Sequence, residues 1–318
     1  MAEKYIFVDS VQEQTPIYEM SEEEFKRIQE ANKIVFDVYR VEELFVMLIE
    51  NFHAFNNVIL TIADRARLQL MSSDNYFQKN IAVNRAALNF FATLNMYQDY
   101  ICERIDCKEI GKDFSKNPNI QKCMGMRNYI QHVESFPVIS NTSYSQCDLD
   151  VMLSSVRFLV AAKKLKIDKL HKGTREAFSK LFDSEEKIDL YEIINCGIGE
   201  VLLTQKRIRE LPLYKDYYLS RMFLLDMEKK ISTSGISIYH PCYYFESGEE
   251  QNLKTLFVAI DTIKFIDKNV ASYDYTFPIA NNFITTAPPD FVKKCVKEIL
   301  TPALRQKISE QNESAKKR

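Results

Sequence analysis

Apolar residues recur at steps of three or four along the first part of the chain, which is the spacing of one buried face of an α-helix. Between Ile17 and Ile110 the sequence contains neither Gly nor Pro, the residues that most often interrupt helices. Ser21 and Glu24 are spaced as a capping box, and regularly spaced apolar positions from Ile34 to Ile62 follow them. This segment predicts one long amphipathic helix, or two helices with a bend, in a mainly α-helical protein.

Local signals predict the next helix boundaries. The polar run 71–75 predicts a turn, and a second long helix is expected over residues 76–104. A loop is expected over residues 112–118. It leads into a helix start, because the Asn117 side chain can cap free amides and Pro118 fits the first helical position. That helix is expected to run to about residue 135 and to stop before Pro137.

Shorter patterns follow. Residues 138–144 and 156–160 predict two short strands of a β-hairpin, and residues 168–182 and 187–210 predict helices. We therefore expect residues 1–210 to form a helical bundle with a short β-hairpin insertion. Residues 211–318 are expected to form a mixed α/β region. Its predicted parts are helices over 214–230, 250–268 and 291–309, an edge strand over 236–245, and an irregular aromatic segment over 271–289.

The composition changes this picture little. The net charge of −2 does not indicate general nucleic-acid binding, although a local basic groove is compatible with it. The seven Cys are odd in number and form no CxxC pair, so we expect reduced thiols in the cytoplasm. We find no signal peptide and no run of about 20 apolar residues, so no membrane span is expected.

Metal and cofactor signals are weak. His240 and Cys242 lack two further ligands at a usual spacing, and the chain contains no glycine-rich phosphate loop. We expect neither a metal nor a cofactor.

One polar cluster in the helix predicted after Pro118 carries candidate chemistry. Asn128 and His132 are four residues apart and share a helix face, and the long Arg127 side chain can reach the same side. Cleavage of RNA by its own 2′-hydroxyl requires proton transfer and stabilisation of a crowded, negatively charged phosphorane. An imidazole exchanges protons near neutral pH, and a guanidinium binds phosphate oxygens in pairs. Two copies related by a two-fold axis would supply both acid and base.

The segment Arg127-Asn128-x-x-x-His132 resembles the signature of the HEPN superfamily, in which Arg, commonly followed by Asn, precedes His by a few residues. The resemblance covers roughly residues 30–210 and includes the helix bearing Asn84–Asn89. It implies an all-α bundle that dimerises through the motif helices. It also implies metal-independent ribonuclease activity, which many members use as toxins or in antiviral defence.

The chain departs from some toxin members at one position. These members have a modified Tyr two residues after the motif His, where this chain has Glu134. Control by that modification is therefore not expected.

Charged and polar residues elsewhere in the chain are candidates to support the motif. Asp99 or Glu103 would either orient Arg127 or His132, or form an ordinary structural ion pair with Arg127, and Gln131 lies one turn above Arg127. A run of basic side chains can steer RNA phosphates, although a solvated helix start is the better explanation of it. Its members are Lys163, Lys164, Lys166, Lys172 and Arg175.

The sequence leaves three functional hypotheses. The first is a homodimeric endoribonuclease acting on RNA through Arg127, Asn128 and His132. The second is a non-catalytic component of a defence or toxin–antitoxin complex that binds RNA or a partner on the same fold. The third is a toxin silenced by a regulatory protein that contacts residues 271–289.

Overall fold

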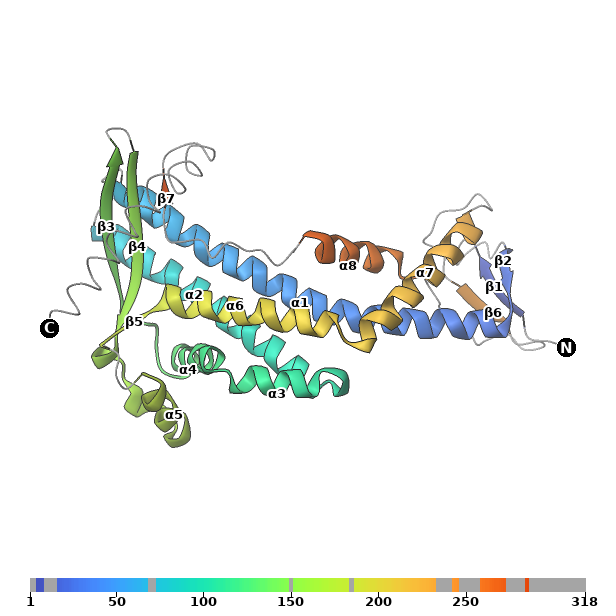
Figure 1. Ribbon diagram of the computed structural model, residues 1–318, viewed down its shortest axis with the longest axis horizontal. Helices are drawn as coiled ribbons and strands as arrows, with labels where there is room; N and C mark the ends of the chain where they lie inside the picture. Colours follow the sequence, from blue (N-terminus) through green and yellow to red (C-terminus); the bar gives the residue numbers. More distant parts are fainter. Residues whose placement is uncertain are drawn as a thin grey trace, which may run out of the picture. The chain divides into compact units, whose positions relative to one another are not determined.

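The computed structural model describes residues 4–8, 16–67, 73–148, 151–182, 186–232, 242–245, 258–272 and 284–285. These residues form eight α-helices and seven short strands, so the predicted mainly α-helical class is confirmed (Figure 1). The helices are α1 (Glu22–Arg67), α2 (Ser73–Glu103), α3 (Lys108–Lys116), α4 (Pro118–His132), α5 (Lys172–Phe182), α6 (Leu190–Arg209), α7 (Pro212–Ser232) and α8 (Ile260–Ser272).

The strands form two small antiparallel sheets. They are β1 (Lys4–Val8), β2 (Pro16–Met20), β3 (Val138–Asp148), β4 (Val151–Ala161), β5 (Lys187–Asp189), β6 (Cys242–Phe245) and β7 (Ile284–Thr285). One sheet has the order β2-β1-β6, with Tyr5 opposite Tyr244. The other has the order β3-β4-β5, with Val138 opposite Val160, and β7 pairs with β4. The sequence did not predict β1, β2, β5 or β7.

The chain divides into two compact units, each built from three segments. The first unit comprises residues 1–51, 91–124 and 196–277, and the second comprises residues 52–90, 125–195 and 278–318. This grouping keeps residues 196–277 together and does not follow the expected boundary after residue 210. The division into 1–210 and 211–318 stays a prediction.

The predicted start of the first helix is confirmed in atomic detail. Ser21 Oγ accepts a hydrogen bond from the Glu24 amide at 3.2 Å, and Glu24 Oε2 accepts one from the Ser21 amide at 3.0 Å. This is the reciprocal capping box that the spacing indicated. The helix α1 is a single helix of 46 residues. The next helix, α2, begins at Ser73, within the predicted turn 71–75.

The predicted loop 112–118 is wrong, because most of it lies in α3. Ile110, Gly111 and Phe114 form a buried face of this helix, and the Phe114 ring packs edge-on against Tyr97 at 5.7 Å. A Cβ atom on Gly111 would lie 2.8 Å from the Cα of Cys102. Gly111 therefore permits close packing of α3 on the preceding chain, whereas in the sequence it looked like a helix breaker.

Two other helices differ slightly from their predicted limits. The start of α4 is confirmed, since Asn117 Oδ1 accepts a hydrogen bond from the Asn119 amide at 2.9 Å, but α4 ends at His132 rather than near residue 135. The helix predicted from residue 187 begins at Leu190 as α6. Asp189 Oδ1 accepts a hydrogen bond from the Tyr191 amide at 2.9 Å and so caps this helix.

The C-terminal predictions are tested in part. The helix predicted over 214–230 is confirmed as α7, and β6 lies within the predicted strand 236–245. Residues 258–259 are not helical, and α8 begins at Ile260 and continues to Ser272. Residues 250–257, the predicted helix 291–309, and positions 273–283 and 286–289 of the segment expected to be irregular lie outside the described residues.

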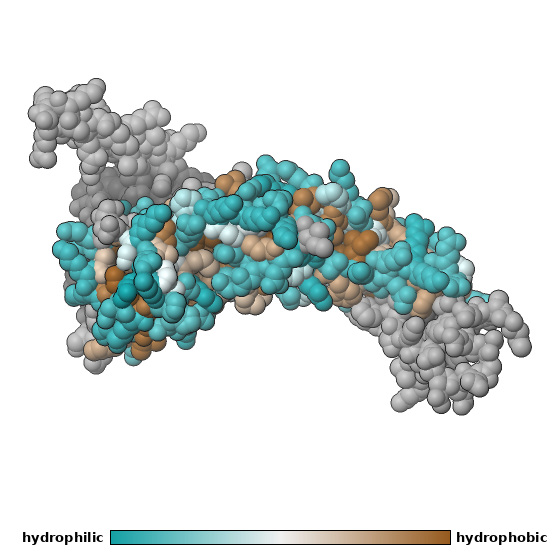
Figure 2. Space-filling model, turned by 90° about the horizontal axis from the view of Figure 1, so that it is seen from below, coloured by the Kyte–Doolittle hydropathy of each residue, from teal (hydrophilic) through white to brown (hydrophobic). Residues whose placement is uncertain are grey.

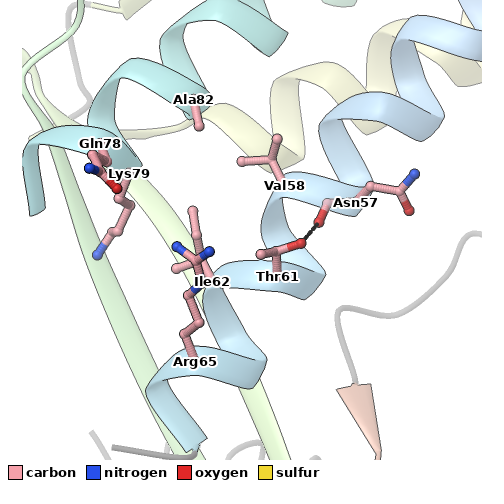
Figure 3. Close-up of a pocket in the computed structure, with 8 residues that line it drawn as sticks. All are labelled: Asn57, Val58, Thr61, Ile62, Arg65, Gln78, Lys79 and Ala82. Atoms are coloured by element: carbon pink, nitrogen blue, oxygen red, sulfur yellow. Dashed lines mark hydrogen bonds between the residues drawn. The ribbon is translucent and has the colours of Figure 1, made fainter. Parts of the chain in front are cut away.

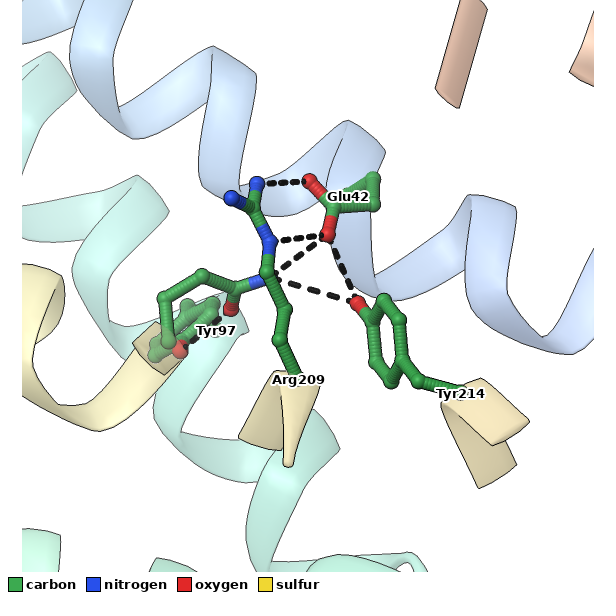
Figure 4. A network of polar contacts seen from close by, with 5 residues as sticks. Glu42, Tyr97, Arg209 and Tyr214 are labelled. Atoms are coloured by element: carbon green, nitrogen blue, oxygen red, sulfur yellow. Dashed lines mark hydrogen bonds and ion pairs between the residues drawn. The ribbon is translucent and has the colours of Figure 1, made fainter. Parts of the chain in front are cut away.

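A fully buried carboxylate organises the core of the first unit (Figure 4). Glu42 Oε1 accepts hydrogen bonds from Arg209 Nε at 2.7 Å, the Tyr214 hydroxyl at 2.7 Å and Gln205 Nε2 at 3.0 Å. Glu42 Oε2 accepts a further bond from Arg209 Nη2 at 2.6 Å. The Tyr97 hydroxyl donates to Gln205 Oε1 at 2.9 Å. Since Glu42 is 0% exposed, this network supplies the partners that a buried charge requires.

The surface is mainly hydrophilic on the face shown in Figure 2, with separate hydrophobic patches. Among the described residues, α7 exposes Tyr218, Leu219 and Met222. By length and composition alone, residues 22–63 of α1 meet the criterion for a membrane span, which the sequence had not indicated. In the most apolar window of that segment, 44% of the residues are buried inside the protein. A core helix with one buried face satisfies the same criterion.

Candidate functional site

The motif residues lie on the last two turns of α4, within the second unit. The opposite side of this stretch is packed against aromatic residues. The Tyr129 ring stacks on Phe136 at 5.6 Å and contacts Phe178 of α5 at 6.1 Å. A Cβ atom on Gly125 would lie 3.4 Å from the Phe182 ring, so α5 approaches α4 closely at this glycine. This packing fixes which side of α4 remains free for Arg127, Asn128 and His132.

The structure brings Arg127 and Asn128 together. Arg127 Nη1 donates a hydrogen bond to Asn128 Oδ1 at 2.9 Å. Arg127 Nε is buried and has no hydrogen-bond partner among the described residues. Burial of an unpaired donor of a charged group costs free energy, so this guanidinium is suited to accept an anionic partner.

His132 and Gln131 are exposed at the end of α4. Helical geometry places His132 one turn beyond Asn128 on the same face. The edge therefore offers a half-buried guanidinium oriented by an amide, followed by an imidazole open to solvent. Such an edge is able to bind a phosphate oxygen at Arg127 and to exchange a proton at His132.

The chain leaving the motif helix is held by Asn84 of α2. Asn84 Oδ1 accepts a hydrogen bond from the Phe136 amide at 2.7 Å, and Asn84 Nδ2 donates to the Phe136 carbonyl at 3.2 Å. Both peptide groups are thereby satisfied in a buried environment. The resemblance includes the segment 84–89, but the sequence predicted no role for Asn84. Its only signal was an amide on an otherwise apolar helix face.

Glu134 and Lys166 form an ion pair beside the motif. Lys166 Nζ lies 2.6 Å from Glu134 Oε2, and the backbone amide of Lys166 donates to the Tyr129 hydroxyl at 3.2 Å. The hydrogen bond from Lys166 lowers the pKa of the Glu134 carboxyl, and burial raises the pKa of the Tyr129 hydroxyl. Glu134 is therefore bonded to Lys166, one of the residues that the sequence predicts to bind RNA.

The other predicted basic residues are mostly exposed. Lys163 lies 4.0 Å from Glu186, and both side chains are exposed. Lys164 precedes Lys166 on the surface, and α5 carries exposed Lys172 and half-buried Arg175. All of these residues belong to the second unit with the motif. Their binding to RNA stays a prediction.

The acidic residues expected to orient the motif belong to the first unit. Asp99 and Glu103 are exposed on α2, and Asp99 Oδ2 accepts a hydrogen bond from Asn95 at 2.7 Å. Their predicted interaction with Arg127 or His132 stays a prediction.

No group of three or more His, Cys, Asp or Glu side chains positioned to hold a metal ion occurs within the described parts of the chain. No family model, curated protein or solved structure matches this sequence.

Proposed function

We propose that this chain is a metal-independent endoribonuclease of the HEPN type. The proposal rests on the hydrogen bonding of the Arg127 guanidinium. Its Nη1 donates to Asn128, whereas its Nε is buried with no hydrogen-bond partner among the described residues. In a purely structural arginine, each buried donor, Nε included, would have a hydrogen-bond partner. A guanidinium that is bonded only to a neutral amide among the described residues, next to an exposed imidazole, matches the needs of phosphodiester cleavage.

Each motif residue has a distinct role in this reaction. The 2′-oxygen of the substrate attacks the adjacent phosphorus, and the bond from phosphorus to the 5′-oxygen breaks. The products are a 2′,3′-cyclic phosphate and a 5′-hydroxyl. His132 transfers a proton to or from one of these oxygens, Arg127 stabilises the charge on the phosphorane, and Asn128 orients Arg127.

The proposal includes a homodimer formed through the α4 helices of two chains. One chain supplies a single motif histidine, whereas the reaction uses both a base for the 2′-hydroxyl and an acid for the leaving oxygen. A two-fold axis beside α4 would place two copies of His132 at one cleft. The exposure of His132 and Gln131 is consistent with an α4 edge that a second chain can approach.

The cellular role follows from the same resemblance. We infer a cytoplasmic toxin or antiviral effector that acts on RNA, built on an HEPN-like bundle with β3 and β4 as its hairpin insertion. A regulatory protein that restrains such an effector is part of this proposal.

The test is RNA cleavage by the purified full chain in the presence of EDTA. We expect wild-type protein to cleave RNA, to leave 2′,3′-cyclic phosphate and 5′-hydroxyl ends, and to spare a linkage whose 2′-hydroxyl is replaced by hydrogen. His132→Ala should lower the cleavage rate by about 10²–10⁴-fold, the usual contribution of a general acid or base.

His171→Ala provides the matched control, because His171 is also an exposed histidine of the second unit but lies outside the motif. It should leave the rate unchanged. Loss of cleavage in EDTA, or equal rates for wild type and His132→Ala, would overturn the proposal. RNA binding without any cleavage would favour the non-catalytic alternative instead.

A further inference from the structure

The helix α7, in the first unit, has an exposed apolar face. Its buried side includes Leu224 and Tyr217, and the Tyr217 hydroxyl donates to Asp267 of α8 at 3.0 Å. On the opposite side, Leu219 is 68% exposed and Met222 is 67% exposed. Adjoining apolar side chains on a surface favour a partner that removes them from water.

Two opposite charges lie at the ends of this apolar face. Lys215 lies four residues before Leu219, and its side chain is exposed. Asp226 lies four residues after Met222 and is also exposed. Steps of four, three and four residues keep these side chains in one line along the helix. We call this line the α7 stripe; it consists of Lys215, Leu219, Met222 and Asp226.

Asp226 already has one partner within its own helix. Its Oδ2 atom lies 3.0 Å from Lys230 Nζ, and both side chains are about half exposed. Such an exposed pair contributes little to stability. Since a carboxylate can accept several hydrogen bonds, Asp226 can bind a second cation beside Lys230.

The α7 stripe is complementary to itself when two copies lie antiparallel. Its four residues are symmetric about the midpoint between residues 220 and 221. A two-fold axis at this midpoint brings Lys215 opposite Asp226 of the partner subunit. The same axis brings Leu219 opposite Met222 of the partner subunit. Two opposite-charge pairs would then flank an apolar centre, whereas a parallel pair in register would bring like charges together.

We propose that a second copy of this chain binds antiparallel along the α7 stripe. The apolar centre supplies the affinity, and the two charge pairs fix the direction. The contact is independent of the proposed ribonuclease activity, because α7 belongs to the first unit and the motif residues belong to the second. Where the proposed α4 dimer also forms, the α7 contact joins these dimers into larger assemblies.

The first test is sedimentation equilibrium of the full chain at about 1–100 μM, the range suited to an interface as small as one helix face. Wild type should self-associate in this range. Leu219→Glu places a charge at the apolar centre, so the dissociation constant should rise at least about tenfold. Because Leu219 is exposed, this variant should fold, which circular dichroism checks. Leu203→Glu is the matched control, since Leu203 is 63% exposed on α6 outside the stripe; it should associate like wild type.

Charge reversal tests the antiparallel direction. Lys215→Glu brings two acidic groups together at each end of the contact, and Asp226→Lys brings two cations together there. Each variant alone should therefore associate at least about tenfold more weakly than wild type. In an equimolar mixture of the two variants, opposite charges face each other again at both ends. Association of the mixture should return to within about threefold of wild type.

Arg65→Glu is the control for charge reversal. Arg65 is an exposed cation of α1 in the second unit, where it lines a cavity of about 350 Å³ between α1 and α2 (Figure 3). This variant should associate like wild type. The proposal is overturned if wild type associates no more tightly than Leu219→Glu, or if the mixture stays as weak as its two components.

RNA cleavage separates this proposal from the ribonuclease proposal. Leu219→Glu should cleave RNA at the wild-type rate, because Leu219 lies outside the unit that contains the motif residues. Self-association that Leu219→Glu weakens, in a protein that cleaves no RNA, would support the α7 contact and contradict the ribonuclease.

Discussion

Two arginines in different units of this protein have contrasting surroundings. In the first unit, Arg209 donates from Nε and Nη2 to the buried Glu42 carboxylate, and its guanidinium lies 5.4 Å from the centre of the Phe45 ring. In the second unit, Arg127 is bonded to the neutral amide of Asn128, and its Nε has no hydrogen-bond partner among the described residues. Among the described residues, Arg209 therefore has a carboxylate partner, whereas Arg127 has only a neutral amide.

The contrast separates a structural role from a functional one. Protein interiors satisfy their buried polar groups, and exceptions are found where a ligand or substrate supplies the missing partner. Arg209 is fixed by charges that the chain itself provides. Arg127 is bonded to a neutral amide, and we propose that an RNA phosphate is its anionic partner.

Arg209→Gln should cause the largest loss of stability. It leaves the Glu42 carboxylate buried without its cationic partner, and breaking a buried ion pair costs about 3–5 kcal/mol. Urea unfolding followed by circular dichroism measures this loss. Arg207→Gln is the control on the same helix, because Arg207 pairs with Asp113 at 2.9 Å where both side chains are at least half exposed. It should cost less than about 1 kcal/mol. Equal losses for the two variants would contradict the structural role of Arg209.

Asn84→Ala should lower the free energy of unfolding by about 1–3 kcal/mol, because it leaves the buried Phe136 amide without its partner, whereas the Phe136 carbonyl keeps the hydrogen bond from the Val138 amide. The same urea experiment measures it. Asn80→Ala is the comparison on α2, since the Asn80 Oδ1 atom is buried with no hydrogen-bond partner among the described residues. Asn80→Ala should lower the free energy of unfolding less than Asn84→Ala does. If Asn84→Ala unfolds like wild type, Asn84 does not hold the end of the motif helix.

Alkaline pH should lower the free energy of unfolding through Tyr214, whose hydroxyl is bonded to Glu42. Burial, reinforced by Glu42, raises the pKa of the Tyr214 hydroxyl well above its usual 10. Above pH 10 the unfolded chain therefore loses this proton while the folded chain keeps it. The stabilisation is complete below pH 10 and decreases by about 1.4 kcal/mol per pH unit above it.

Tyr214→Phe should remove that part of the decrease when the free energy of unfolding is measured at pH 9, 10 and 11. If the free energy of unfolding of this variant falls with pH as steeply as that of wild type, burial does not raise the pKa of the Tyr214 hydroxyl.

Arg127→Gln should change the free energy of unfolding least, by less than about 1 kcal/mol. The variant loses one hydrogen bond to Asn128 but also removes a buried donor that has no partner among the described residues, and the two effects oppose each other. Urea unfolding beside Arg209→Gln gives the comparison directly. A loss as large as that of Arg209→Gln would mean that Arg127 serves the fold.

Local signals in the sequence predicted the starts of α1 and α4 correctly. The capping box of Ser21 and Glu24 and the Asn117-Pro118 pair each concern neighbouring residues, so the sequence alone contains the relevant information. The α3 helix was missed because Gly111 packs against the Cα of Cys102, an approach that depends on how the chain folds back. A breaker residue and a close-packing residue are indistinguishable in sequence.

The candidate site was predictable only in part. The residue types and spacing of the motif indicated Arg127, Asn128 and His132. Helical periodicity placed Asn128 and His132 on one face. Glu42 and Arg209, by contrast, are 167 residues apart, so no local pattern indicated which arginine is paired. The support of Phe136 by Asn84 and the pairing of Lys166 with Glu134 depend on tertiary contacts in the same way.

We propose that Arg127, whose Nε has no hydrogen-bond partner among the described residues, binds the RNA phosphate. The most direct test is the single-turnover rate of RNA cleavage by folded Arg127→Gln protein in EDTA. We predict a rate about 10²–10³-fold below that of wild type, the usual loss when one donor to a developing charge is removed. Arg85→Gln, which changes an exposed arginine of the same unit, should cleave at the wild-type rate. A wild-type rate for Arg127→Gln would contradict the account.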